Sequence, residues 1–185
     1  MAPTMRPGDA AFAAVEHVNA ELFTLTYGAI VRQLLTDFEE IEEVNKQLDT
    51  MGYNIGIRLI DDFLAKSNVT RCTEFRETAD AIAKVGFKMF LGATATVSNW
   101  NSDSTECSLI LEENPLVDFV ELPETCQGLH YCNILCGVIR GALEMISMRT
   151  EVKWIRDMLH GDDAFEMRLK LLDQVPEEYP YKDDE

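Results

Sequence analysis

Basic residues are scarce in this sequence. Only 16 lysines and arginines stand against 33 aspartates and glutamates among 185 residues, which gives a formal net charge of −17 at neutral pH. Proteins that bind nucleic acids or anionic lipids through charge rely on lysine and arginine to neutralise phosphates. The charge balance therefore argues against a nucleic-acid-binding protein and against electrostatic docking on a lipid surface.

Long hydrophobic runs and a secretory leader are also missing. No stretch reaches the ~18 uninterrupted apolar residues that cross a bilayer, since Arg140 interrupts the most apolar segment. The first ten residues contain Arg6 and two prolines but no apolar centre, unlike a signal peptide. Five cysteines, an odd number, do not suggest a disulfide framework. We therefore expect a cytoplasmic protein with reduced thiols.

Recognisable catalytic motifs are absent. The three histidines, at positions 17, 130 and 160, have no cysteine, serine or carboxylate at a spacing that fixes a nucleophile and its base. No glycine-rich loop ends in Gly-Lys-Ser or Gly-Lys-Thr, and no GxGxxG motif follows a predicted strand. The sequence therefore favours a protein that is not an enzyme.

Four residues within eleven positions suggest a zinc site as an alternative: Cys126, His130, Cys132 and Cys136. However, Cys132 and Cys136 are four residues apart on a predicted helix, whereas structural zinc prefers paired ligands on turns. We expect these thiols to be small apolar side chains of the core and expect no metal.

Apolar spacing predicts helices first and strands later. We expect helices over about 12–38 (or at least 21–38), 44–64, 73–91 and 128–148, and strands over about 94–100, 107–111, 152–159 and 165–171. Residues 165–171 alternate strictly between apolar and charged, which is typical of a sheet with one solvated face. This order predicts one α+β domain with helices packed on one face of an antiparallel sheet. We place the domain at 11–175, after a disordered extension (1–10) and before an acidic tail (176–185).

Cys72 differs from the other cysteines because it directly precedes a predicted helix. Thr73 is the expected N-cap of that helix, and Arg71 and Arg76 lie nearby in the sequence. A helix N-terminus and guanidinium groups both stabilise a thiolate, the form that attacks a thioester or a disulfide. An ordinary loop cysteine is the alternative interpretation.

Five segments within about 21–170 can be compared with known families. In chain order they are ELFTLTYGAIV, VNKQLDTMGYNIGIRLIDDFLAKS, RCTEFRETADAIAKVGFKMFLG, SLILEENPLVDFVELP and YCNILCGVIRGALEMI. Together they resemble the Bet-three family of subunits of the TRAPP vesicle-tethering complex. The resemblance implies a twisted antiparallel sheet covered by helices and a deep internal hydrophobic tunnel. It also implies a non-catalytic subunit that forms heterodimers with other small TRAPP subunits, and a homodimer when alone. The assembled complex tethers vesicles between endoplasmic reticulum and cis-Golgi, where the subunit is peripheral, and promotes nucleotide exchange on a Rab GTPase.

The resemblance also implies particular site residues. An acyl chain, palmitate, is expected on Cys72 beside Arg71, inside the tunnel. Small residues on the third and fourth predicted helices are the candidates for the tunnel lining: Ala83, Gly86, Gly137 and Gly141. From spacing alone, contact with another helix is the favoured explanation of the last two, and a ligand chain is the alternative.

The C-terminal segment of the family approaches the GTPase. The acidic residues expected to contact a partner are Glu177, Glu178, Asp183, Asp184 and Glu185. Two other functions stay open: a carrier or sensor of diffusible fatty acid, and a thiol enzyme that uses Cys72. The second lacks a recognisable general base near the thiol.

Overall fold

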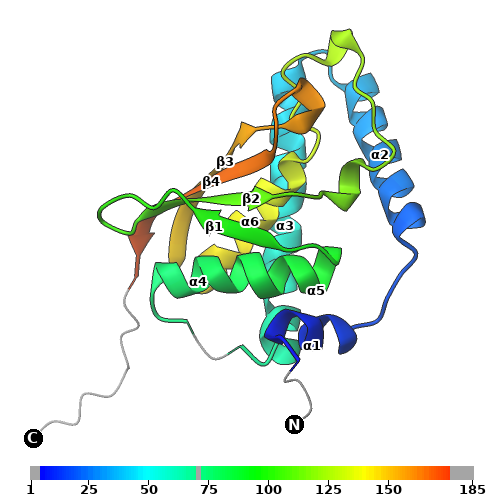
Figure 1. Cartoon of the computed structure of the whole chain (residues 1–185). Helices are drawn as coiled ribbons and strands as arrows, with labels where there is room; N and C mark the ends of the chain where they lie inside the picture. The colour runs from blue at the N-terminus through cyan, green and yellow to red at the C-terminus, as the bar shows by residue number, and fades with distance from the viewer. Residues whose placement is uncertain (1–4, 70–71, 176–185) are drawn as a thin grey trace, which may run out of the picture.

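The computed structural model describes residues 5–69 and 72–175. It confirms an α+β domain with helices packed against one four-stranded antiparallel sheet (Figure 1). The helices are α1 (Pro7–Ala13), α2 (Ala20–Asp37), α3 (Ile41–Lys66), α4 (Phe75–Ala81), α5 (Phe87–Leu91) and α6 (Asn133–Met145). The strands are β1 (Ala95–Ser98), β2 (Glu106–Leu111), β3 (Met148–Arg156) and β4 (Phe165–Gln174), in the order β1-β2-β4-β3.

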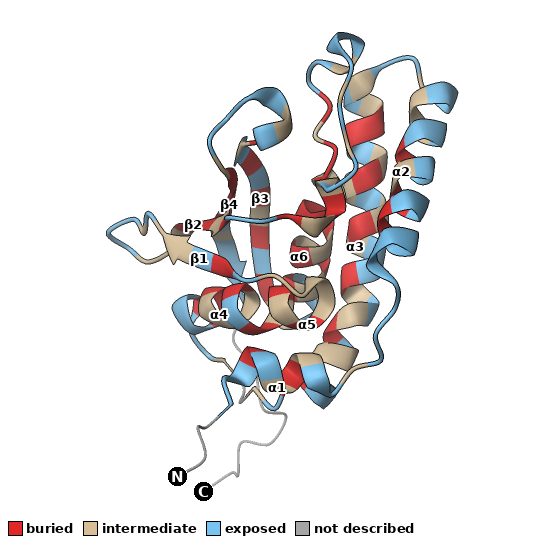
Figure 2. Ribbon diagram, turned by 45° about the vertical axis from the view of Figure 1, so that its right-hand side comes forward, coloured by how far each residue is buried: buried red, intermediate tan, exposed pale blue. Residues whose placement is uncertain are grey.

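Alternating apolar residues set the register of the sheet. Met167 of β4 lies opposite Leu109 of β2 on one side and Trp154 of β3 on the other. All three are buried, so a single apolar row crosses three strands beneath the helices. Figure 2 shows buried residues on these strands and along α3 and α6. The predicted strands are thus confirmed, and they pair as the antiparallel neighbours β1–β2 and β3–β4.

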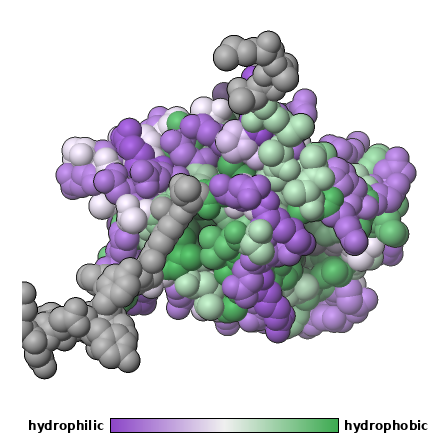
Figure 3. Space-filling view, turned by 90° about the horizontal axis from the view of Figure 1, so that it is seen from below, coloured by the Kyte–Doolittle hydropathy of each residue, from purple (hydrophilic) through white to green (hydrophobic). Residues whose placement is uncertain are grey.

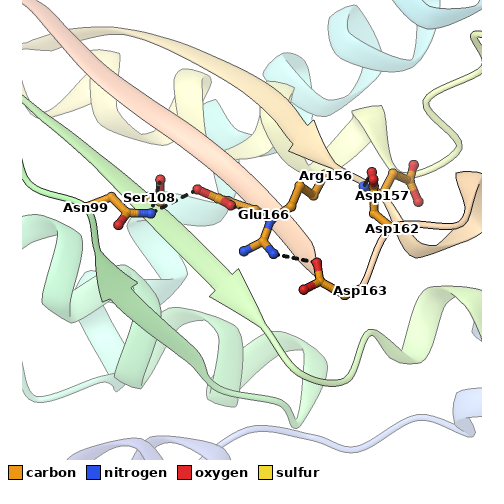
Figure 4. Close-up of polar contacts among 7 residues, drawn as sticks. All are labelled: Asn99, Ser108, Arg156, Asp157, Asp162, Asp163 and Glu166. Atoms are coloured by element: carbon orange, nitrogen blue, oxygen red, sulfur yellow. Dashed lines mark hydrogen bonds and ion pairs between the residues drawn. The ribbon is translucent and has the colours of Figure 1, made fainter.

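Glu166 is an exception to the predicted solvated face of β4, because this carboxylate is buried. Arg156 Nε donates to it at 2.7 Å and Asn99 Nδ2 at 3.3 Å (Figure 4). A hydrogen bond from Ser108 and the pairing with Arg156 lower the pKa of the Glu166 carboxyl below its ordinary value. A charge is tolerated here because several donors surround it.

Glycines bring α3 and α6 into backbone contact. A Cβ atom on Gly52 would lie 2.0 Å from the carbonyl oxygen of Ile134, and one on Gly137 would lie 2.0 Å from that of Asp49. Gly56 and Gly141 make equivalent approaches one turn further along. Larger side chains would hold the two helices apart, so these four positions fix the close crossing on which the domain is built.

The N-terminal region differs from the prediction. The expected helix corresponds to α2, which agrees with the predicted start at 21 rather than the one at 12, and the separate helix α1 begins at Pro7, within the ten residues expected to be disordered. Small residues explain the difference: Ala11 is fully buried, and Gly8 lies against the backbone of Lys84. A short apolar cluster that includes Val85 therefore holds α1 on the rest of the domain.

The third predicted helix also has an unexpected detail. A π-helical turn, Ile82–Gly86, joins α4 to α5, and α4 begins after Glu74 rather than after the expected N-cap Thr73. Gly92 ends α5 with φ +71°, as a C-terminal glycine should. None of the helices within residues 5–69 and 72–175 combines the length and apolar character that crossing a bilayer requires.

Candidate functional site

An apolar cavity of about 1020 Å³ lies between α3, the α4–α5 segment and α6, with α2 along one side. On the lower face of the molecule, as oriented in Figure 1, apolar residues gather in the middle and polar residues surround them (Figure 3). The lining includes Phe23, Tyr27 and Ile30 of α2, Met51, Ile55, Leu59 and Phe63 of α3, Ile82, Gly86 and Phe90 of the α4–α5 segment, and Val138, Ala142 and Met145 of α6. Such walls accept hydrocarbon and offer little to a polar ligand.

One apolar stripe of α3 both fills the core and lines the cavity. Val44 and Leu48, at its beginning, are fully buried. Met51, Ile55 and Leu59 continue the same helical spacing but line the cavity, and Ile55 keeps 41% of its surface exposed. Periodicity predicted all five as buried core, because it reports the face of a helix and not what covers that face.

The π-helical turn shapes one wall of the cavity. Ile82 and Gly86, its first and last residues, both line the cavity. A Cβ on Gly86 would meet no atom closer than 3.9 Å, and Phe63 is one of its two nearest neighbours. This glycine therefore leaves open space that a larger side chain would occupy. Such turns often mark functional sites in helices.

Cys72 lies at the mouth of the cavity, where it is half-buried and is one of the lining residues. Burial raises the pKa of the Cys72 thiol above its ordinary value, the carboxylate of Glu77 raises it further, and a hydrogen bond with Thr78 acts in the opposite direction. The prediction of a stabilised thiolate is therefore wrong. The structure instead presents a neutral thiol to an apolar space.

Arg76 explains part of this difference. Arg76 stacks its guanidinium over the ring of Trp100, 4.8 Å from the ring centre, where the charge interacts with the aromatic face. Arg71 lies outside the described residues. Sequence proximity thus placed Arg76 near the thiol, whereas the first turn of α4 gives it a different partner.

The candidate lining glycines separate into two groups. Gly86 lines the cavity, as predicted. Gly137 and Gly141 do not, because their faces lie against the backbone of α3, and the alternative of helix packing is the right one. Ala83 is fully buried in the core on another face of the π-helical turn. The tail residues predicted to contact a partner, 177–178 and 183–185, lie outside the described residues.

Within the described part of the chain, no three histidine, cysteine or acidic side chains cluster closely enough to hold a metal ion. Cys132 and Cys136 are buried in the core, as expected. Burial raises the pKa of Cys132 to about 12, and the pKa of Cys136 is also raised, chiefly by burial. These thiols stay protonated and serve as small apolar side chains.

Comparison with known proteins confirms the resemblance. The family described as "Transport protein particle (TRAPP) component" matches residues 23–170. The chain is 52% identical over 174 residues to trafficking protein particle complex subunit 3 of Dictyostelium discoideum, with 94% of each chain covered. It is 52% identical over 178 residues to transport protein particle subunit bet3 of Schizosaccharomyces pombe, with 96% of this chain and 97% of that one covered.

A solved structure is also similar. It is trafficking protein particle complex subunit 3 from Naegleria fowleri, covalently bound to palmitic acid. The TM-score is 0.84 and the sequence identity 51%, with 88% of this chain and all of that chain covered. The chain described here therefore belongs to the TRAPP component family, in its Bet3 branch of non-catalytic subunits that act in vesicle tethering and endoplasmic reticulum-to-Golgi transport.

Proposed function

We propose that this chain is a structural subunit of a TRAPP particle and holds a palmitoyl chain on Cys72 inside the apolar cavity. One observation carries the proposal: the half-buried Cys72 opens onto an apolar cavity of about 1020 Å³. That volume is at the upper end of the ~300–1,000 Å³ typical of small-molecule sites. The palmitic acid bound covalently to the Naegleria fowleri protein supports the same ligand here.

The chemistry of the linkage is a thioester. The Cys72 sulfur attacks the carbonyl of an activated acyl donor such as an acyl thioester, the donor thiol leaves, and the Cys72 proton passes to solvent. The raised pKa keeps the reactive thiolate fraction of Cys72 small at neutral pH, and that fraction grows as the pH increases. The acyl chain then removes apolar wall from water, so the lipid acts as a part of the core rather than as a membrane anchor.

Filling the cavity from its wall should prevent acylation. In Gly86→Leu, the new side chain extends into the space toward Phe63, where the acyl chain would lie. We expect at least a fivefold lower fraction of acylated protein, measured by intact mass spectrometry of the purified chain. Gly86→Ala is the matched control and should keep the wild-type fraction, because its Cβ meets only ordinary contacts. Equal acylation of the leucine variant and the wild type would show that the acyl chain does not occupy this cavity.

α2 has two apolar stripes that serve different purposes. Phe23, Tyr27 and Ile30 face the cavity. Leu22 and Leu25 are on the outer side of the helix, and Leu25 is 62% exposed. Exposed apolar stripes of this kind mark protein interfaces. Since TRAPP subunits work as an assembly, we assign the outer stripe of α2 to a neighbouring small subunit in a heterodimer.

Placing a charge on the outer stripe should weaken assembly without unfolding the subunit. Leu25→Glu would have to bury a carboxylate against the partner, and we expect at least about tenfold weaker binding to sister subunits. Quantitative pull-down of co-expressed subunits measures this. Phe119→Glu, which alters a large apolar residue of similar exposure (61%) outside α2, is the control. Retention of the partner by Leu25→Glu would remove α2 from the interface.

Two further parts of the proposal rest on family membership. The assembled particle, rather than this subunit alone, promotes nucleotide exchange on a Rab GTPase, with the C-terminal acidic residues near the GTPase. The subunit is cytoplasmic and peripheral at endoplasmic reticulum and cis-Golgi membranes, held there through the particle.

A further inference from the structure

The C-terminal end of β4 lies at the mouth of the apolar cavity, next to Cys72. Gln174 and Val175 line the same cavity as Cys72 and Thr73. The Gln174 Nε2 donates a hydrogen bond to the carbonyl oxygen of Thr73 at 3.1 Å, across 101 positions of sequence. In Figure 1, β4 accordingly ends beside the start of α4. A residue from the end of the described chain thus contacts the residue that follows the candidate acylation site.

The sheet itself explains why this contact matters. β2 pairs with β4 only as far as Lys170, so the last residues of β4 have a neighbouring strand on one side alone. On that side, Gln174 lies opposite Met148, and the Val175 amide donates to the Ser147 carbonyl oxygen at 3.0 Å. On the other side, the contact that holds Gln174 is Thr73. The position of the thiol-bearing segment and the position of the end of β4 are therefore set together.

We propose that Gln174 is a positioning residue for the thioester at Cys72, an inference that rests on the proposed acylation. Its hydrogen bond lies at the surface, where both Gln174 and Thr73 are exposed, and it holds Thr73 so that the sulfur–acyl linkage lies between the start of α4 and the end of β4. The linkage and the C-terminal end of the domain form one coupled unit. Coupling between two sites is reciprocal: displacing the end of β4 exposes the linkage, and removing the acyl chain loosens the end of β4.

The first test measures how fast the linkage is attacked. Full-length protein in a Cys126→Ser background is loaded with hexadecyl methanethiosulfonate, which transfers a hexadecylthio group to the Cys72 sulfur and releases methanesulfinate. Release of that group by dithiothreitol is then followed by intact mass spectrometry. Because the group is attached chemically, this test does not depend on whether Cys72 is acylated naturally. Natural acylation is measured separately, from the mass of untreated wild-type protein.

We expect release to be about 2- to 10-fold faster in Gln174→Met, the range that one hydrogen bond can supply. Methionine keeps the size of the side chain and removes only the donor. Gln174→Lys, which restores a donor of similar reach, should return the rate toward that of wild type. Gln127→Met, at an exposed position that does not line the cavity, is the matched control. Equal rates for Gln174→Met and Gln127→Met would overturn the proposal.

The second test measures whether the group on Cys72 changes the mobility of the end of β4. Hydrogen exchange of the Val175 amide should be about 2- to 10-fold slower in protein that carries the hexadecylthio group than in protein without it. The exchange rates of the amides that pair β2 with β4 should not change. Gln174→Met should abolish that difference, an effect that loss of overall stability would not produce. Identical Val175 exchange with and without the chain would contradict the coupling, even if untreated wild-type protein carried palmitate.

Discussion

Acylated wild-type protein should melt at least about 8 °C above the Cys72→Ser variant. Sixteen carbons enclosed by protein contribute at most about 12 kcal/mol, at about 0.8 kcal/mol for each methylene removed from water. Even one third of that limit, about 4 kcal/mol, corresponds to roughly 8–16 °C for a domain of this size. Without the acyl chain, the apolar walls of the cavity around Ile82 and Val138 face water or an empty space.

Differential scanning calorimetry measures this difference. Wild-type protein of confirmed acylation is compared with the same protein after hydroxylamine treatment and with Cys72→Ser, and the last two should melt together. Cys126→Ser, which changes another half-buried cysteine, should melt with the acylated wild type. Equal melting temperatures for acylated protein and Cys72→Ser would contradict the role of the lipid as part of the core.

Of the glycine-to-alanine substitutions on α6, Gly137→Ala should cause the largest loss in the free energy of unfolding. The added Cβ would lie 2.0 Å from the carbonyl oxygen of Asp49 and 2.7 Å from the amide nitrogen of Tyr53. Both are backbone atoms of α3, so no side chain can move aside and the two helices must separate. We expect a loss of at least about 4 kcal/mol in the free energy of unfolding, or failure to fold.

Urea denaturation, or the yield of folded protein where the variant is too unstable, checks this expectation. Gly86→Ala is the control, since its Cβ meets nothing closer than 3.9 Å and its backbone is already helical. It should change the free energy of unfolding by no more than about 1 kcal/mol. A Gly137→Ala variant as stable as Gly86→Ala would show that α3 and α6 do not touch through their backbones.

Local pattern was sufficient to predict most of the fold. The alternation in β4 predicted the strand and its buried face, and the four predicted strand ranges each overlap one strand of the sheet. Glycines four apart on α6 indicated close packing with a second helix, which α3 supplies. The pattern did not reveal α1, because that helix depends on small residues such as Gly8 fitting against the π-helical turn.

The site was predictable in part. The cysteine singled out by its place before a helix does line the cavity, but the electrostatic reason given for choosing it was wrong. Arg76 interacts with Trp100, while burial and, secondarily, Glu77 raise the pKa of the Cys72 thiol. The direction of a side chain in the first turn depends on which tertiary partner it finds, and sequence spacing does not report that.

The apolar spacing of the sequence could not predict the cavity. Leu48 and Ile55 belong to one apolar stripe of α3, yet the first is fully buried and the second lines the cavity. An apolar face predicts burial against something apolar, and a lipid satisfies that requirement as well as a neighbouring helix does. Gln174 was likewise missed, since its contact with Thr73 joins segments 101 positions apart.

The central claim is that Cys72 carries an acyl chain within this domain. Intact mass spectrometry of the full chain purified from eukaryotic cells, before and after hydroxylamine, tests it most directly. We predict one palmitoyl group per wild-type molecule, released by hydroxylamine and absent from Cys72→Ser. Wild-type protein of unmodified mass, or an adduct that persists in Cys72→Ser, would contradict the claim.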